Sequence, residues 1–163
     1  MNELMKTLDA MKGLRIMVAG DLMLDTFIYG DVDRISPESP VPVLNIQKQD
    51  TMLGGAGNVL SNLCALGITP VVFAVVGDDE QGKNSVDIAK KAGADVNGIL
   101  IDDSRPTTLK TRYLARHQHL LRTDFEKTHP LSSDMETKLF TAIEKALKNV
   151  KAVVLSDYGK GVL

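Results

Sequence analysis

The chain has 163 residues, of which 44% are hydrophobic and 25% charged, and its formal net charge is −2. These values are typical of a globular domain with a real core and argue against disorder. The weak negative charge gives no electrostatic reason to expect nucleic acid or a membrane surface as a partner. The single cysteine, Cys64, excludes an internal disulfide and fits a reducing cytoplasm, and its apolar surroundings predict a core residue.

The first elements predicted along the chain are a helix and a short buried strand. Apolar residues recur at helical spacing between Asn2, a possible cap, and Gly13, which ends the helix. Residues 15–19 then have the composition of a buried strand that ends at Gly20. Within residues 26–49, the runs 27–30 and 41–46 are strand-like and flank a polar stretch over 31–40. The prolines at positions 37, 40 and 42 indicate an edge or flap instead of a central strand.

The middle and end of the chain alternate between strand and helix patterns. Residues 71–76 are a continuous apolar run, typical of a strand buried on both faces of a parallel sheet. The alternation predicts an α/β layered fold with a mostly parallel sheet. The other predicted elements are a helix over 80–92, a strand over 96–101, a hairpin of 107–115 with 120–125, a helix begun by a Ser133–Glu136 capping box, and a strand over 152–155.

The most informative segment is a glycine-rich turn at residues 53–58, in which Gly54, Gly55 and Gly57 precede Asn58 and an apolar helical run. Glycine allows another molecule to approach the backbone closely, and a helix N-terminus offers unpaired N–H groups. The turn therefore favours a site for a hydroxyl-rich or anionic ligand, and a simple tight connection before a buried helix is the alternative. It matches neither the P-loop nor the dinucleotide fingerprint.

Polar side chains also follow several of the predicted strands. Open parallel sheets bind ligands beyond the carboxyl ends of their strands, so repeated placement of polar groups there favours a binding site. Each group by itself is equally explained as a helix cap or a turn residue. The groups are Asp21 and Asp25, Gly54 to Asn58, Asp78 and Asp79, and Asp157 with Lys160.

A set of basic residues lies in the predicted hairpin. Lys110, Arg112 and Arg116 share parity along one strand, and Arg122 lies on the partner strand, so they are expected to project from one face. A planar guanidinium binds phosphate through two hydrogen bonds, which would suit a phosphorylated ligand. The alternative is a solvated sheet face. No metal-ligand spacing surrounds the nearby histidines, and no metal site is predicted.

Several of these segments together resemble the ribokinase-like (PfkB) sugar kinases. The Gly54–Asn58 turn, with Gly67 and Gly77 at their spacings, is similar to the first signature of that family. Four further segments, and in particular residues 34–43, resemble the bacterial D-glycero-D-manno-heptose 7-phosphate kinases. In many bacteria such a kinase is the first domain of a bifunctional ADP-heptose synthase. These segments are residues 20–25, 34–43, 121–126 and 155–161.

The resemblance implies a ribokinase-like fold with a small β-strand lid over about residues 27–48, and ATP with magnesium for the complete enzyme. By position, Asp25 matches the carboxylate that holds sugar hydroxyls. The lid strands of this family commonly pair across a homodimer. The expected substrate-binding residues are Asp25, Gly54, Gly55, Asn58, Arg112, Arg116, Arg122, Asp157 and Lys160, with the arginines assigned to the phosphate of the substrate.

The family carries its Gly-Ala-Gly-Asp anion hole, catalytic Asp and nucleotide pocket in a C-terminal half that has no counterpart in this sequence. Residues 19–21, Ala-Gly-Asp, are superficially similar to the Gly-Ala-Gly-Asp motif. They follow the first predicted strand and do not open a helix, so they are not the catalytic motif. We therefore expect residues 1–163 to be the N-terminal, substrate-binding part of a kinase. By itself it is expected to be inactive and to bind neither ATP nor magnesium. A sheet cut after Leu155 would expose one face or edge of a buried strand, so we expect the fragment to associate, to swap strands, or to be only the ordered part of something longer.

The complete enzyme is expected to phosphorylate the 1-hydroxyl of heptose 7-phosphate, a step of ADP-heptose and lipopolysaccharide inner-core synthesis in the cytoplasm. Its expected partners are a small sugar phosphate and a second copy of the chain, with no nucleic acid or membrane. Two alternatives remain at this point. One is a fragment of another PfkB-type sugar kinase, and the other is a non-catalytic module that binds a sugar phosphate.

Overall fold

Two four-stranded sheets organise residues 3–163, the part of the chain that the computed structural model describes. The body sheet has the order β5-β4-β1-β8 and is parallel throughout, and the lid sheet has the order β3-β2-β6-β7. The body strands are Arg15–Gly20 (β1), Thr69–Val76 (β4), Asp95–Ile101 (β5) and Ala152–Ser156 (β8). The lid strands are Leu22–Ile35 (β2), Pro42–Gly55 (β3), Thr108–Ala115 (β6) and Gln118–Phe125 (β7).

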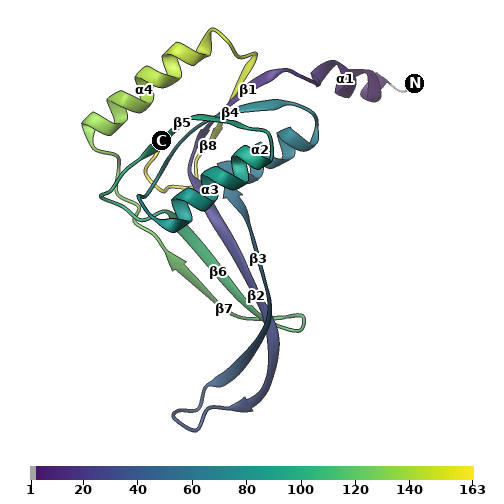
Figure 1. The fold of residues 1–163 in the computed structure, drawn as a ribbon, viewed down its shortest axis with the longest axis vertical. Helices are drawn as coiled ribbons and strands as arrows, with labels where there is room; N and C mark the ends of the chain where they lie inside the picture. Colours follow the sequence, from purple (N-terminus) through teal and green to yellow (C-terminus); the bar gives the residue numbers. More distant parts are fainter. Residues whose placement is uncertain (1–2) are drawn as a thin grey trace.

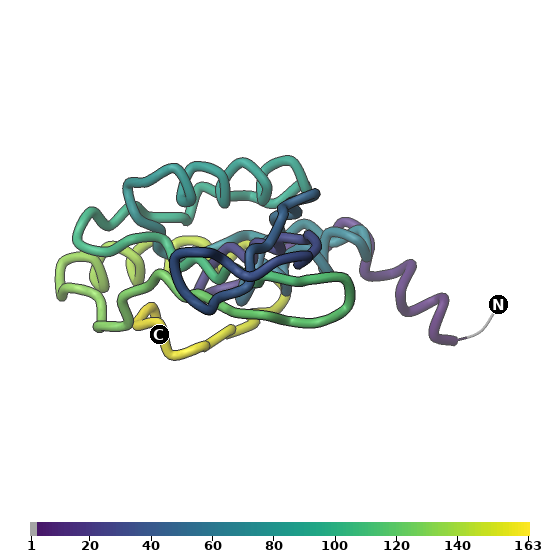
Figure 2. Tube along the Cα trace, turned by 90° about the horizontal axis from the view of Figure 1, so that it is seen from below, coloured from purple at the N-terminus to yellow at the C-terminus, as the bar shows by residue number. Residues whose placement is uncertain are grey.

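Four helices complete the described chain, and three of them cover the body sheet. They are Glu3–Met11 (α1), Ala56–Ala65 (α2), Glu80–Lys91 (α3) and Ser133–Leu147 (α4). Helices α2 and α3 lie on one side of the body sheet and α4 on the other, while α1 extends away at the N-terminal end (Figure 2). The predicted α/β fold with a mostly parallel sheet is confirmed. The proposed cap Asn2 lies outside the described residues.

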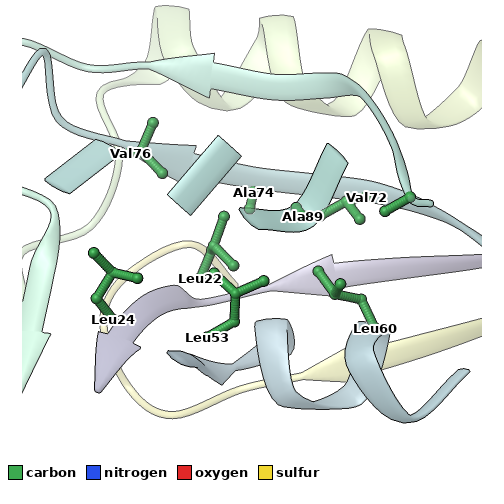
Figure 3. Packing of buried hydrophobic residues seen from close by; sticks show 9 residues of the cluster. Leu22, Leu24, Leu53, Leu60, Val72, Ala74, Val76 and Ala89 are labelled. Atoms are coloured by element: carbon green, nitrogen blue, oxygen red, sulfur yellow. The ribbon is translucent and has the colours of Figure 1, made fainter. Parts of the chain in front are cut away.

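Strand β4 shows why a continuous apolar run belongs at the centre of this sheet. Val72, Ala74 and Val76 face α2 and α3, where they pack with Leu60 (Figure 3). The alternate residues of the strand, with Phe73 at their centre, face α4. Both faces of the strand are therefore buried, as the sequence predicted.

Cys64 is partly buried and packs against the α2–α3 side of the core. Burial raises the pKa of the Cys64 thiol, which lowers its thiolate fraction at neutral pH. The prediction of a core residue is confirmed.

The lid sheet projects from the body, with the turn between β2 and β3 at its far end (Figure 1). Strands β2 and β3 are antiparallel, β6 joins β2 in parallel, and β7 closes the sheet as the antiparallel partner of β6. The expected lid of residues 27–48 covers only the outer part of this sheet. The expected hairpin does not stand alone but adds to β2, because an isolated two-stranded ribbon is marginally stable in water.

Side chains cap two of the helices, and one of these caps differs from the prediction. Helix α3 is capped by Asp79, whose Oδ1 accepts a hydrogen bond from the backbone N–H of Gly82 at 2.7 Å. Helix α4 is capped by Ser132, which accepts from the N–H of Met135 at 3.3 Å. The expected capping box that starts at Ser133 is therefore wrong by one residue, since the preceding serine has the extended backbone that a cap requires.

Candidate functional site

The glycine turn lies where β3 passes directly into α2, and it packs against β2. A Cβ atom on Gly54 would lie 2.2 Å from Oδ2 of Asp25, and one on Gly55 would lie 2.3 Å from the carbonyl oxygen of Asp21. Gly55 also has a φ of 58°, which side-chain-bearing residues rarely adopt. Gly54 therefore brings the backbone of the turn into contact with the Asp25 carboxylate, and Gly55 brings it into contact with the backbone of Asp21.

Helix α2 begins at this turn without a side-chain cap. The N–H of Ala56 donates to the carbonyl of Asp21 at 2.9 Å, and the N–H groups of the first turn beyond it receive no side-chain cap. Asn58 is exposed on that turn, where its carbonyl accepts from the amide of Asn62 at 2.9 Å. The helix start thus presents N–H donors next to the Asp25–Gly54 contact and an exposed amide side chain on its first turn, groups that can bind a hydroxyl-rich ligand.

Arg112 is the partner of the Asp25 carboxylate. Strands β2 and β6 are neighbours, and Nη1 of Arg112 donates to Oδ1 of Asp25. The guanidinium also lies over the ring of Phe27, with its central carbon 5.1 Å from the ring centroid. The charge of Arg112 is thus engaged by Asp25, and its most direct effect is to fix the direction of that carboxylate. Its expected contact with a phosphate stays a prediction.

Five charged side chains form a continuous series of ion pairs on the same face of the lid sheet. We call it the charged series, and in order it contains Arg122, Asp124, Lys110, Glu126 and Lys160. Asp124 is 2.9 Å from both Arg122 Nε and Lys110 Nζ, and Glu126 is 3.3 Å from Lys110 Nζ and 2.8 Å from Lys160 Nζ. Lys160 follows β8, so the series connects the lid sheet to the body.

The carboxylates of the charged series are stabilised in their ionised form. The hydrogen bond from Lys110 is the main cause that holds the pKa of Asp124 below its ordinary value, and Arg122 adds to it. Burial works to raise the pKa of Glu126, but the bonds from Lys160 and Lys110 outweigh it and lower that pKa. Both groups are therefore anions at neutral pH and compete with any external anion for these cations.

Two expected site residues lie outside this arrangement. Arg116 does not share the face of Lys110 as a strand residue, because β6 ends at Ala115 and Arg116 occupies the turn with a φ of 53°. Its side chain is 78% exposed and approaches Asp31 at 3.4 Å. Asp157 is exposed, and its Oδ1 accepts from the N–H of Gly159 at 2.8 Å within its own loop. The parity argument for Arg116 is therefore wrong.

Asp21 positions the loop that carries Lys160. Its side chain is buried and accepts hydrogen bonds from the backbone N–H groups of Tyr158, Lys160 and Val162 at 2.7, 3.1 and 3.3 Å. The sequence singled out Asp21 only as a polar residue after a strand. A buried carboxylate needs such partners, and here they fix the backbone from which Lys160 reaches Glu126.

A buried ion pair between Arg105 and Asp102 also contacts the loop that carries Lys160. Nε of Arg105 is 2.8 Å from Oδ2 of Asp102, and the two side chains are 5% and 9% exposed. Arg105 also donates to the carbonyls of Lys160, His129 and Pro130 at 3.0–3.1 Å. The sequence reasoning missed this pair, since an Asp and an Arg three residues apart in a loop are usually solvated.

A comparison with known protein families identifies the family of this chain. Residues 14–162 match the family described as pfkB family carbohydrate kinase. The chain belongs to the pfkB family. The resemblance inferred from the glycine turn and its neighbouring segments is thereby confirmed.

Curated relatives of this pfkB chain carry the name Bifunctional protein HldE. The one from Paramagnetospirillum magneticum is 44% identical over all 163 residues, which cover 33% of that protein. The one from Helicobacter pylori strain J99 is 44% identical over 91% of this chain and 32% of its own length. The chain therefore spans about a third of the length of the curated relatives that it matches.

Solved structures of sugar kinases share the fold. A carbohydrate kinase from Agrobacterium tumefaciens superposes with a TM-score of 0.65 at 19% identity, over 87% of this chain and 45% of that one. A sugar kinase from Pyrococcus horikoshii, solved in complex with ATP, has a TM-score of 0.58 at 19% identity over 86% and 42% of the two chains. At these identities the similarity supports the ribokinase-like fold and nothing finer.

Two further properties of this pfkB chain concern metals and membranes. Within residues 3–163, no three His, Cys, Asp or Glu side chains gather in a way that could hold a metal ion. Over the same residues, every helix is too short or too polar to cross a bilayer.

Proposed function

We propose that this chain is the substrate-binding part of an ATP-dependent kinase that phosphorylates the 1-hydroxyl of D-glycero-D-manno-heptose 7-phosphate. That reaction would lead to ADP-heptose and the lipopolysaccharide inner core. The observation that carries the proposal is the contact between the Asp25 carboxylate and Gly54 at the uncapped start of α2. A carboxylate accepts hydrogen bonds from sugar hydroxyls, while backbone N–H groups donate to their oxygens.

The charged series supports a substrate that already carries a phosphate. Asp25, Lys110 and Asp124 are successive cross-strand partners on β2, β6 and β7. Directly opposed residues have their Cβ atoms about 5 Å apart, so the cations around Asp124 lie within the reach of one sugar molecule bound at Asp25. Arg122 and Lys110 would bind the phosphate, and Asp25 with Arg112 would bind the hydroxyls.

Phosphoryl transfer itself would require groups from outside residues 3–163. It depends on charge stabilisation around the transferred phosphate, and this chain spans about a third of the length of the curated relatives that it matches. We therefore propose that ATP and magnesium bind to further parts of a longer enzyme and that the chain by itself transfers no phosphate. Phe140 on α4 and Val153 and Leu155 on β8 support this, since they expose an apolar surface that further polypeptide could cover.

The outer lid strands offer a second apolar surface, which we propose as the contact of a homodimer. Ile35, Val41 and Ile46 are all at least half exposed there. Ile46→Lys would place a charge in that contact. We expect light scattering to show a shift from dimer to monomer for this variant, and an unchanged mass would contradict the assignment.

Binding measurements test the proposed substrate. We expect isothermal titration of the complete enzyme to show clearly tighter binding of heptose 7-phosphate than of fructose 6-phosphate, and Asp25→Ala to abolish the difference. Equal affinity for the two sugar phosphates would contradict the substrate assignment. A kinase assay on the 163-residue chain is expected to give no turnover, and any turnover would contradict its proposed incompleteness.

A kinase for an unphosphorylated sugar is the second candidate. The specific observation in its favour is that Lys110, Arg112 and Arg122 are already neutralised by carboxylates. Arg122→Ala separates the two candidates. A phosphorylated substrate should lose about tenfold or more in affinity, whereas an unphosphorylated sugar should bind almost unchanged.

A further inference from the structure

Asp124 is held as an anionic ligand would be held. Arg122 approaches it through two nitrogens, with Nε 2.9 Å from Oδ1 and Nη2 3.1 Å from Oδ2. Lys110 adds a third donor at 2.9 Å from Oδ2. A guanidinium fork with an added ammonium group is the donor set that proteins use to bind phosphate. The carboxylate of Asp124 therefore fills a site suited to a phosphate oxyanion.

From this geometry, and resting on the proposed function, we propose that Asp124 is an internal competitor for the phosphate of the sugar phosphate. The incoming phosphate takes its place between Arg122 and Lys110. The residue thereby sets the affinity for phosphorylated ligands. It is a specificity-determining residue, because an unphosphorylated sugar has no group that could displace it.

The positions of the partners show why Asp124 is the carboxylate that leaves. Arg122 is 57% exposed and Asp124 26%, on the edge strand β7, so both can change rotamer without disturbing the core. Lys110 is only 14% exposed and keeps its second partner, Glu126, at 3.3 Å. Loss of Asp124 from the pair leaves Lys110 in place for the phosphate.

Glu126 is unsuited to the same role. It lies between Lys110 and Lys160, and its side chain is 19% exposed. Lys160 is in turn fixed through its backbone by Asp21. Displacement of Glu126 would break the ion pair between the lid sheet and the loop after β8, whereas displacement of Asp124 changes contacts within the lid sheet alone.

Asp124→Asn tests the proposal, because it removes the competing charge but keeps the size of the side chain. Isothermal titration of the 163-residue chain with heptose 7-phosphate is expected to show about fivefold tighter binding than for the unaltered chain, as expected when an exposed ion pair no longer competes. Unphosphorylated heptose should bind both proteins equally. Unchanged or weaker binding of heptose 7-phosphate by Asp124→Asn would overturn the proposal, as would undetectable binding by both proteins.

Asp50→Asn is the matched control. Asp50 pairs with Lys48 at 2.6 Å on β3, the opposite edge strand of the same sheet, and its replacement changes the net charge by the same amount. An equal gain in affinity for Asp50→Asn would show that net charge alone is responsible. Thermal unfolding establishes that both variants are folded, and Asp124→Ser gives a second measurement with a smaller side chain.

The same titrations separate this inference from the proposed function. If the unaltered chain binds heptose 7-phosphate and fructose 6-phosphate equally, the substrate assignment fails. In that case Asp124→Asn should still tighten binding of both sugar phosphates. If heptose 7-phosphate is preferred but Asp124→Asn binds it no more tightly, the proposed function survives and the role of Asp124 is excluded.

Discussion

The body sheet and the outer edge of the lid sheet, at β7, differ in the contacts that hold their strands. In the body, β4 is buried on both faces, and Val18 and Val72 at the centre of the sheet are fully inaccessible to solvent. In the lid, every residue of β7 is exposed, and the charged series and the Asp25–Arg112 pair lie on one face. Apolar burial therefore stabilises the body and the base of the lid, where Leu24 and Leu53 join the core, while the outer part of the lid carries ionic contacts that a ligand can exchange.

This difference shows where stability and binding can be altered separately. An exposed ion pair contributes little to stability, so its replacement by contacts with a ligand costs the fold little. A close-packed apolar interior offers no comparable freedom, because the loss of one side chain leaves a cavity. Variants in the two regions should therefore differ in whether they lower stability or affinity.

The largest loss of stability is expected from the buried ion pair at the base of the lid. Asp102→Asn leaves Arg105 charged and buried without its ion-pair partner, which should lower the free energy of unfolding by about 4 kcal/mol. Urea denaturation measures the change. The control is Asp9→Asn, which breaks the exposed Lys12–Asp9 pair of α1 and should cost no more than about 0.5 kcal/mol. Equal costs would show that burial of the pair has no energetic consequence.

A core truncation compares the two sheets directly. Leu60 is fully buried on α2, so Leu60→Ala should lower the free energy of unfolding by about 3 kcal/mol. Leu121 on β7 is 57% exposed, and Leu121→Ala should cost no more than about 0.5 kcal/mol. Urea denaturation of the pair tests the contrast between body and lid. Similar losses would mean that β7 is stabilised by apolar burial as well.

Gly54→Ala should affect binding more than stability. The new Cβ would lie 2.2 Å from Oδ2 of Asp25 and would push that carboxylate from its place beside Arg112. We expect a stability loss of about 1 kcal/mol and at least about tenfold weaker binding of the sugar phosphate, by titration. In an Asp25→Ala background the same substitution should have almost no further effect on affinity. A full additional loss there would exclude an action through Asp25.

The smallest expected effect is a dependence of stability on acid pH. Burial works to raise the pKa of Asp79, but hydrogen bonds from Thr107 and Gly82 outweigh it and hold the pKa below its ordinary value. The stability that this gives is present above about pH 4, the ordinary aspartate pKa, and is lost as the pH falls through the lowered value. Asp79→Asn should cost about 1 kcal/mol at neutral pH and flatten the acid side of the profile. An unchanged slope would contradict the assignment.

The body could be predicted from the sequence because two-sided burial leaves a strong pattern. Residues 71–76 are apolar without interruption and became β4, and the predicted helix over 80–92 became α3. The lid sheet could be predicted only in part, since its parallel pairing of β2 with β6 joins segments about 80 residues apart that carry no shared signal. Its strands are also polar on one face, so alternation alone did not mark their full length.

The candidate site also contains residues that the sequence predicted and residues that it did not. Its turn, Gly54 and Gly55, was identified because glycines at a helix start have a specific physical use. The roles of Asp124 and Glu126 were missed, although the alternation of Arg122 and Asp124 along β7 already places these two on one face, and Glu126 continues the alternation directly after the strand. Asp102 with Arg105 gave no such signal, because burial of a loop ion pair follows from tertiary packing and not from local sequence.

The absence of a side chain at Gly54 has a consequence for protein engineering. Oδ2 of Asp25 already occupies the space that any Cβ there would need. Every replacement at position 54 must therefore displace the carboxylate or destabilise the turn. Redesign of this chain for a different sugar should therefore leave the turn untouched and diversify the strands that face it.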